Sequence, residues 1–227
     1  KVAKEDEKIN FSVPTGNFGD IYAGYIAKKM GLPINKLIVA TNTNDILKRV
    51  ITTGIYEPTK VKQTVSPSMD IQVASNFERL IFDIFDCNSE KTSKLMKNLK
   101  ETGKFKIEKK FLQKINEDFC SESLSEKETK LVINKTYKDQ KILIDPHTAI
   151  AIGAVDKISL EGSTIVLATA HPAKFSEVVM QETSVKPQLP ENLKNILVKK
   201  EILKKLPKNL KIVQNYGPDL ENLPTHF

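Results

Sequence analysis

The segment Pro14-Thr-Gly-Asn-Phe-Gly-Asp20 has residue types and a spacing suited to holding an anion. It follows a short apolar run and precedes a helical pattern that starts at about Asp20. Glycine adopts torsions closed to other residues, so Gly16 and Gly19 are expected to let successive N–H groups converge on one point. The unpaired N–H groups and positive dipole end of the following helix face the same point.

These features favour a phosphate as the ligand of the glycine loop. The loop is neither G-x-G-x-x-G nor a Walker loop, because no G-K-[ST] follows it. An ordinary strand-to-helix turn capped by Asp20 is the alternative that spacing alone leaves open. The candidate phosphate-binding residues are Gly16, Asn17, Phe18, Gly19 and Asp20.

A second polar group follows the apolar run Thr164–Ala168, which is typical of a buried strand. Thr169 comes directly after it and offers a hydroxyl that can hydrogen-bond an unprotonated ring nitrogen. A plain strand-end or helix-capping role for Thr169 is the alternative. His171 and Lys174 follow at the expected start of a helix.

A third group is Asp145-Pro-His147, at another turn into a helix. Its favoured interpretation is structural, with Asp145 capping the helix. His147 and His171 are far apart in the sequence, and no G-x-S-x-G motif accompanies them, so a hydrolase triad has little support.

The elements that must position these groups alternate between strand and helix patterns. Residues 11–13 and 37–40 flank a helix over about 20–30, which predicts a right-handed βαβ unit. Further patterns predict helices near 45–53, 76–85, 90–101, 109–119, 125–137, 146–154 and 172–181, and strands at 141–144 and 164–168.

This order predicts an α/β fold with an open, mostly parallel sheet and flanking helices. The expected parts are a first portion of the α/β domain at 1–75 with the phosphate loop, a helical insertion at 76–140, the rest of the α/β domain at 141–186, and a tail at 187–227. Ser125 and Glu128 have the spacing of a capping box.

Composition narrows the classes of partner. The net charge of +7 comes from lysines interspersed with acids, and the sequence has no tryptophan, so a nucleic-acid partner is not expected. Two cysteines without a His/Cys cluster disfavour a disulfide framework or a metal site and fit the cytoplasm. The sequence contains no apolar stretch of membrane-spanning length, so no membrane partner is expected.

Five blocks in order make the sequence resemble the C-terminal portion of the threonine synthases, with the bacterial and fungal type as the better match. They are VPTGNFGDIYAGYIAKKMGLP, LIVATNTNDIL, SPSMDIQVASNFERL, DPHTAIAIGA and LATAHPAKF. The resemblance covers nearly the whole chain to about Phe175, and five ordered blocks are far more specific than one glycine loop.

The resemblance implies part of a fold-type II pyridoxal 5'-phosphate enzyme, a lyase that converts O-phospho-L-homoserine and water to L-threonine and phosphate. It places the cofactor phosphate at the loop Gly16–Asp20 and the pyridine nitrogen at Thr169. The family's Schiff-base lysine lies in a motif S-F-H-G-P-T-x-A-F-K-D, which this sequence does not contain. No catalytic residue is therefore expected in the chain, which should be inactive alone and need the N-terminal part of a longer polypeptide as its partner.

Two other functions stay open at this point. One is another lyase of the same cofactor class, and the other is a non-catalytic module that binds a phosphorylated ligand. The family-like blocks also contain candidates for binding the substrate's phosphate and carboxylate, although nothing in the sequence assigns them: Ser66, Ser68, Asp70, Asn76 and Arg79.

Overall fold

The computed structural model describes residues 7–201, 203 and 205–216. The chain divides into two compact units, Lys1–Gln188 and Leu189–Phe227. The phosphate-loop residues Gly16–Asp20 and the residue Thr169 all belong to the first unit.

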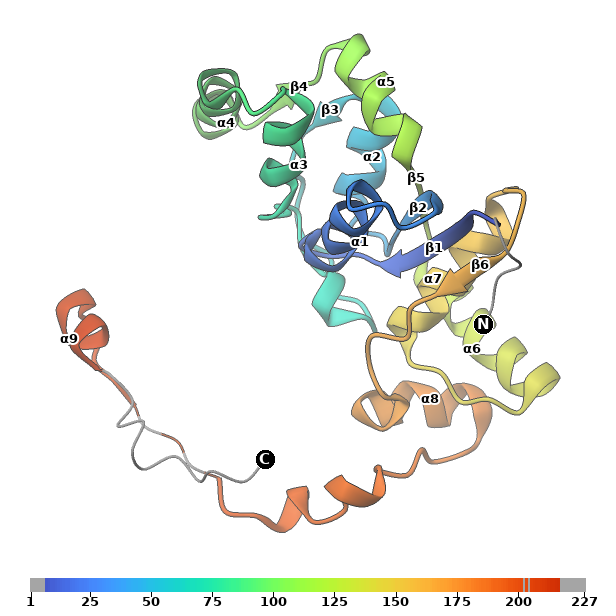
Figure 1. Ribbon diagram of the computed structural model, residues 1–227. Helices are drawn as coiled ribbons and strands as arrows, with labels where there is room; N and C mark the ends of the chain where they lie inside the picture. Colours follow the sequence, from blue (N-terminus) through green and yellow to red (C-terminus); the bar gives the residue numbers. More distant parts are fainter. Residues whose placement is uncertain (1–6, 202, 204, 217–227) are drawn as a thin grey trace. The chain divides into compact units, whose positions relative to one another are not determined.

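A four-stranded sheet in the order β5-β2-β1-β6 forms the centre of the first unit (Figure 1). Its strands are β1 (Ile9–Pro14), β2 (Ile34–Thr41), β5 (Phe119–Ser123) and β6 (Thr164–Val166). Every pair of neighbours is parallel, which confirms the expected open parallel α/β sheet.

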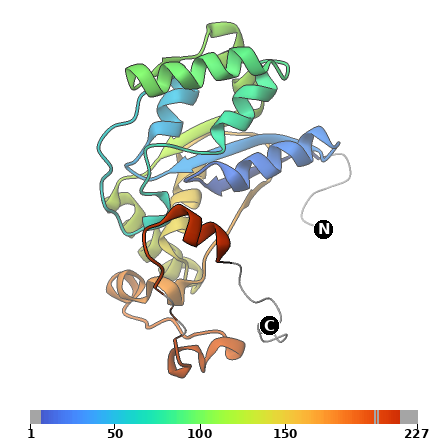
Figure 2. The ribbon, with the colours of Figure 1, turned by 90° about the vertical axis from the view of Figure 1, so that its left-hand side faces the viewer.

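Helices cover both faces of this sheet because the side chains of β2 alternate between two cores. Leu37 and Val39 pack in a cluster with residues of α1 (Gly19–Lys29), α2 (Ile46–Thr53), α3 (Phe77–Ile84) and α5 (Lys109–Asp118). Ile38 and Ala40 pack instead with α7 (Pro146–Lys157). Figure 1 shows α1 and α2 on one side of the sheet and α7 on the other, and Figure 2 shows α1 running along the strands.

The expected helical segment 76–140 also contributes two strands. It holds α3, α4 (Ser89–Thr102), α5 and α6 (Glu126–Gln140), and a short antiparallel pair joins β3 (Ile55–Tyr56) to β4 (Phe105–Lys106). Between α5 and α6, however, β5 pairs with β2 at the edge of the main sheet. The predicted capping box is confirmed, because Ser125 Oγ accepts from the Glu128 amide while the Glu128 carboxylate accepts from the Ser125 amide.

The expected strand at 141–144 is wrong, since these residues form no regular element. Leu143 and Ile144 pack instead in a separate cluster with Ile133 of α6 and Val178 of α8 (Ser176–Thr183). Their apolar character therefore serves packing between helices. A 3₁₀ helix, η2 (Pro172–Phe175), precedes α8.

The second unit is described by itself as two short 3₁₀ helices, η3 (Glu191–Leu193) and η4 (Ile196–Val198), and one short helix, α9 (Leu210–Asn215). The remaining short 3₁₀ helix, η1 (Pro67–Met69), lies in the first unit. Across the described residues, none of the helices combines the length and the apolar character needed to cross a membrane.

Candidate functional site

The parallel pairing of β1 with β6 brings the glycine loop and Thr169 together. Ser12 pairs with Val166, and the amide of Leu167 donates to the Ser12 carbonyl oxygen at 2.9 Å. Both strands therefore end at the same edge of the sheet, with Gly16 a few residues beyond one and Thr169 a few residues beyond the other. Carboxyl ends of parallel strands are where α/β proteins bind ligands.

Gly16 and Thr169 line one cavity of about 230 Å³ at this edge. The cavity wall also contains Pro14, Asp20, Ser68, Met69, His147, Ala170 and Lys174. Of the predicted phosphate-binding residues, Gly16 and Asp20 thus face the same space as Thr169. Two of the other candidates, Asn17 and Gly19, lie against Asn76, and Phe18 is in the core.

The structural reason for Gly16 is close approach, which corrects the expectation based on torsions. Neither Gly16 nor Gly19 has a left-handed backbone conformation. A Cβ at Gly16 would lie 2.5 Å from the carbonyl oxygen of Ser68, so no side chain fits there. A Cβ at Gly19 would lie 3.3 Å from Nδ2 of Asn76, whose side chain can move.

Phe18 carries the left-handed conformation of the loop, with φ of 68°. Such a torsion is costly for a bulky residue and persists only where packing imposes it. The Phe18 ring is 1% exposed and contacts Phe77 and Phe119 at centroid distances of 5.2 and 5.6 Å. Phe18 therefore anchors the loop in the hydrophobic core and is not among the residues that line the cavity.

The loop leaves backbone donors free for an anion. The amide of Thr15 donates to the Ala40 carbonyl oxygen at 2.8 Å, whereas the amides of residues 16–18 donate to no atom of the described residues. The first amides of α1 are unpaired as well, as at any helix start. The carbonyl oxygen of Asn17 accepts hydrogen bonds from the backbone amide and from Nδ2 of Asn76, at 3.1 and 3.0 Å.

Ser68 and Met69 reach the cavity from a loop that the half-buried carboxylate of Asp70 holds in place. Asp70 accepts hydrogen bonds from Nδ2 of Asn42 and of Asn44 at 2.8 and 3.0 Å, and from the amide and hydroxyl of Thr64 at 2.8 and 2.7 Å. Two of the candidates for substrate binding, Asp70 and the fully buried Ser66, therefore accept hydrogen bonds from other residues of the protein in this structure.

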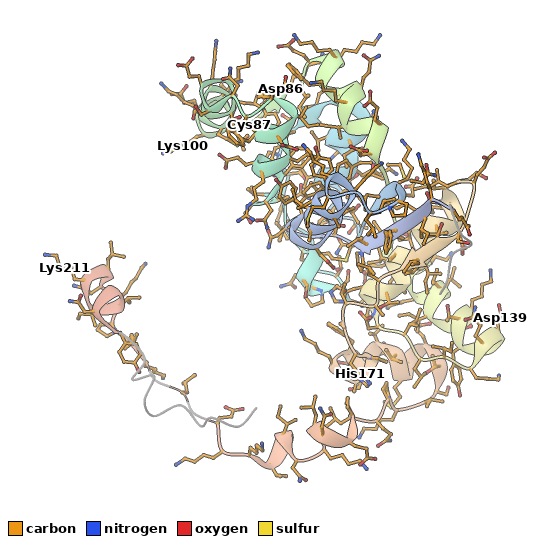
Figure 3. All side chains as sticks on the ribbon, in the orientation of Figure 1. Asp86, Cys87, Lys100, Asp139, His171 and Lys211 are labelled. Atoms are coloured by element: carbon orange, nitrogen blue, oxygen red, sulfur yellow. The ribbon has the colours of Figure 1, made fainter. Side chains whose placement is uncertain are left out.

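On the other side of the cavity, Thr169 and Lys174 present polar groups. Thr169 is exposed, and its hydroxyl makes no hydrogen bond to the described residues. His171 lies outside the cavity wall, is exposed (Figure 3), and its Nδ1 accepts from the amide of Ala173 at 3.2 Å. Thr169 rather than His171 is thus available to a ligand.

The sequence assigned His147 to turn structure alone, whereas the structure also places it in the cavity wall. The predicted cap is confirmed, since the Asp145 carboxylate accepts from the amides of His147 and Thr148 at 2.9 and 3.4 Å. The same carboxylate contacts His147 Nδ1 at 2.9 Å. The helix α7 packs against β1, and the Ser12 hydroxyl donates to the Ala151 carbonyl oxygen at 2.7 Å. This packing brings His147 to the edge of the sheet where the cavity lies.

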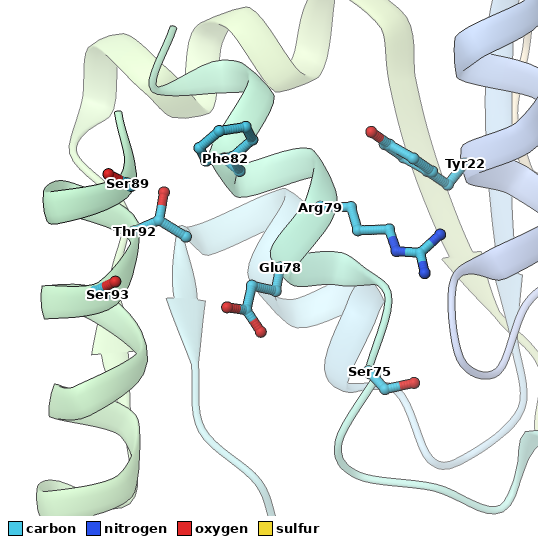
Figure 4. A pocket seen from close by; sticks show the side chains of 8 residues that line it. All are labelled: Tyr22, Ser75, Glu78, Arg79, Phe82, Ser89, Thr92 and Ser93. Carbon is cyan, nitrogen blue, oxygen red and sulfur yellow. The ribbon is translucent and has the colours of Figure 1, made fainter. Parts of the chain in front are cut away.

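A larger cavity of about 440 Å³ lies between α1, α3 and α4, and no residue of the glycine loop lines it. Figure 4 shows Arg79 extending from α3 towards Tyr22 of α1, and Glu78 extending towards α4. Arg79 is exposed and, within the described residues, forms no ion pair. Arg79 is therefore not among the residues that line the cavity shared by Gly16 and Thr169.

Comparison with known proteins gives consistent matches. The family described as "Threonine synthase, C-terminal" matches residues 148–216. The threonine synthases of Saccharomyces cerevisiae and Pseudomonas aeruginosa are each 41% identical, over 88% and 92% of this chain and 44% and 45% of their own length. The chain thus spans less than half the length of these relatives.

Solved structures agree with the sequences. The structure of PLP-bound threonine synthase from Brucella melitensis has a TM-score of 0.87 and 45% identity, over 93% of this chain and 46% of that one. Threonine synthase from yeast has a TM-score of 0.78 and 40% identity, over 86% and 43%. The parallel sheet and its flanking helices are thus similar to those of a PLP-bound threonine synthase. The chain is similar in sequence and fold to the C-terminal portion of threonine synthases from bacteria and fungi.

Proposed function

We propose that this chain is the part of a threonine synthase that holds the phosphate and ring of pyridoxal 5'-phosphate. The complete polypeptide would convert O-phospho-L-homoserine and water to L-threonine and phosphate, as a lyase that breaks the carbon–oxygen bond to phosphate. Similarity to threonine synthases over most of this chain supports the proposal, as does the PLP named for the Brucella structure.

The single observation that carries the proposal is that Gly16 and Thr169 line the same cavity. A phosphorylated ring needs an anion site and a polar partner for its nitrogen within one ligand's length. Unpaired amides over residues 16–18 provide the first, and the free hydroxyl of Thr169 provides the second. The absent Cβ at Gly16 keeps the loop pressed against the Ser68 carbonyl group.

The chain's own residues then have distinct tasks. The loop amides and the start of α1 bind the phosphate dianion. The hydroxyl of Thr169 faces the ring nitrogen, and a neutral partner there does not stabilise a protonated ring as a carboxylate does. When bound, the cofactor supplies an electron sink for proton transfers at the substrate carbons. A ring whose nitrogen is unprotonated is a weaker electron sink than a protonated ring, which limits unwanted eliminations.

The test joins the chain to the part of the yeast enzyme that precedes the matching region and that supplies the lysine motif. The chimera should release phosphate from O-phospho-L-homoserine and form threonine, whereas the 227-residue chain alone should do neither. The same chimera with Gly16→Ala is the matched control and should lose activity. Release from phosphohomoserine should exceed turnover of serine or threonine, and the reverse order would point to another lyase of this cofactor class.

A folded chimera that binds the cofactor but forms no threonine would contradict the proposed reaction. A folded chimera that binds no cofactor would contradict the assignment of the cavity itself.

A further inference from the structure

His147 lines the cavity, with one ring nitrogen paired and the other without a partner among the described residues. Its side chain is 4% exposed, and Nδ1 lies 2.9 Å from Oδ1 of Asp145. Nε2 is buried and has no hydrogen-bond partner among the residues that the structure describes. Because an unpaired buried polar atom is costly, such an atom at a cavity needs an explanation.

Asp145 determines which nitrogen carries the proton. Burial alone would raise the pKa of this carboxyl group, but hydrogen bonds from His147 and from Thr148 hold the pKa below its ordinary value. Both oxygens of the resulting carboxylate only accept hydrogen bonds, including one from the Thr148 hydroxyl. In the neutral form of the ring, Nδ1 of His147 therefore carries the proton and donates to Asp145, and the lone pair lies on Nε2.

Neighbouring groups fix the ring without using that lone pair. The ring of Phe175 lies 4.8 Å from the imidazole, centroid to centroid, and covers it with an apolar surface. Lys174 and Asp20 are the other ionisable residues of the cavity wall. Neither makes a hydrogen bond to His147. The lone pair on Nε2 thus has no partner among the described residues.

We propose that His147 is a ligand-binding residue of this cavity, whose Nε2 accepts a hydrogen bond from a hydroxyl group on the ring of the phosphorylated ligand. Asp145 is the positioning residue that keeps the proton on Nδ1. The inference rests on the proposed function for the identity of the ligand. It adds a third point of recognition to the loop amides and Thr169.

The test uses pyridoxine 5'-phosphate, which has the phosphate and the ring hydroxyl, and a hydroxymethyl group in place of the aldehyde that would react with surface lysines. Calorimetry on the 227-residue chain compares this ligand with inorganic phosphate. His147→Asn is the decisive variant, because asparagine Nδ2 can still donate to Asp145 while no atom replaces Nε2. We expect a loss of about tenfold in affinity for pyridoxine 5'-phosphate and unchanged affinity for phosphate.

A measurement on the unaltered protein makes the test independent of the variant's folding. In long-range ¹H–¹⁵N spectra, His147 should show a protonated Nδ1 and an unprotonated Nε2. The Nε2 signal should move when pyridoxine 5'-phosphate is added and stay in place when phosphate is added.

The outcomes separate the two proposals. Equal affinity of the unaltered chain and His147→Asn for pyridoxine 5'-phosphate would overturn the role of His147 and leave the proposed function standing. An Nε2 signal that does not move when the ligand binds would also overturn the role of His147. Failure of the unaltered chain to bind pyridoxine 5'-phosphate would overturn the proposed cofactor site and the role of His147 with it.

Discussion

Gly16 and Thr169 lie at opposite ends of the first compact unit in sequence and line the same cavity in space. The β1–β6 pairing creates this proximity, because the two strands run parallel and in register. The loops that follow them therefore begin at the same edge of the sheet. Within the described residues, the loop after β1 leaves amides unpaired, and Thr169 in the loop after β6 leaves a hydroxyl unpaired. Their combination is what a phosphorylated ring requires.

Gly16→Ala should cost the chain most of its affinity for phosphorylated ligands. The new Cβ would lie 2.5 Å from the Ser68 carbonyl oxygen, so the loop must move and its amides must separate. We expect a loss of tenfold or more in affinity and about 1–3 kcal/mol of stability, measured by calorimetry and urea denaturation. Gly19→Ala is the matched comparison and should lose less, because its Cβ would lie 3.3 Å from a side-chain atom of Asn76 rather than 2.5 Å from a backbone oxygen. Equal effects of the two variants would contradict the close-approach argument.

Asp70→Ala should destabilise the loop that carries Ser68. It removes a carboxylate acceptor shared by Asn42, Asn44 and Thr64, and both asparagines are almost fully buried. Loss of these hydrogen bonds to a charged group should cost about 2–3 kcal/mol in the free energy of unfolding. Glu101→Ala, on the exposed face of α4 with its partner Lys97 3.8 Å away, should cost under about 0.5 kcal/mol. A cost for Asp70→Ala as small as for Glu101→Ala would contradict the buried network.

Glu128 should make stability fall as the pH is lowered. Hydrogen bonds from Lys157 and then from Ser125 lower its pKa from 4.5 to about 2. A lowered folded-state pKa means that this stabilisation is fully present above pH 4.5 and is lost as the pH falls towards 2. The side chain is 42% exposed, so the loss should stay below about 1 kcal/mol.

Urea denaturation of the unaltered chain and Glu128→Gln at about pH 5 and pH 3 isolates this contribution, because other carboxyl groups titrate in both proteins. The difference in stability between the two should shrink at the lower pH. A difference that is constant or grows would contradict the ion pair and capping box.

The two cysteines should react very differently with iodoacetamide. Burial raises the pKa of Cys120 in β5 to about 11, although Lys36 opposes the shift, whereas Cys87 is exposed. Since the thiolate is the nucleophile, the native chain at pH 8 should take up one adduct at Cys87, and the unfolded chain should take up two. Mass spectrometry of tryptic peptides assigns the adducts. Equal rates at both cysteines would contradict the packing of β5 into the sheet.

The parts of the fold that the sequence predicted depend on local patterns. The β1–loop–α1–β2 unit follows from an apolar run, two glycines and a buried helix, and the Ser125–Glu128 capping box follows from spacing alone. The edge strand β5 was assigned to helix and loop because FCSES has one large apolar residue and no alternation. Its pairing with β2 is a tertiary contact that local propensity does not encode.

The site was predicted in outline and differs in two physical details. Glycine suggested unusual torsions, but the left-handed residue is Phe18, whose conformation depends on contacts with Phe77 and Phe119 far along the chain. His147 was assigned to turn structure because its place in the cavity wall depends on how α7 packs beneath β1. Both details arise from long-range packing.

Whether one ligand joins the loop to Thr169 is tested most directly by following backbone amide signals of the ¹⁵N-labelled chain during titration. With inorganic phosphate, the amides of Gly16, Asn17 and Gly19 should shift and that of Thr169 should not. With pyridoxine 5'-phosphate, all four should shift along one saturation curve, and Thr169→Val should weaken that curve several-fold. Shifts confined to other parts of the chain, or separate curves for the loop and Thr169, would contradict a shared cofactor site.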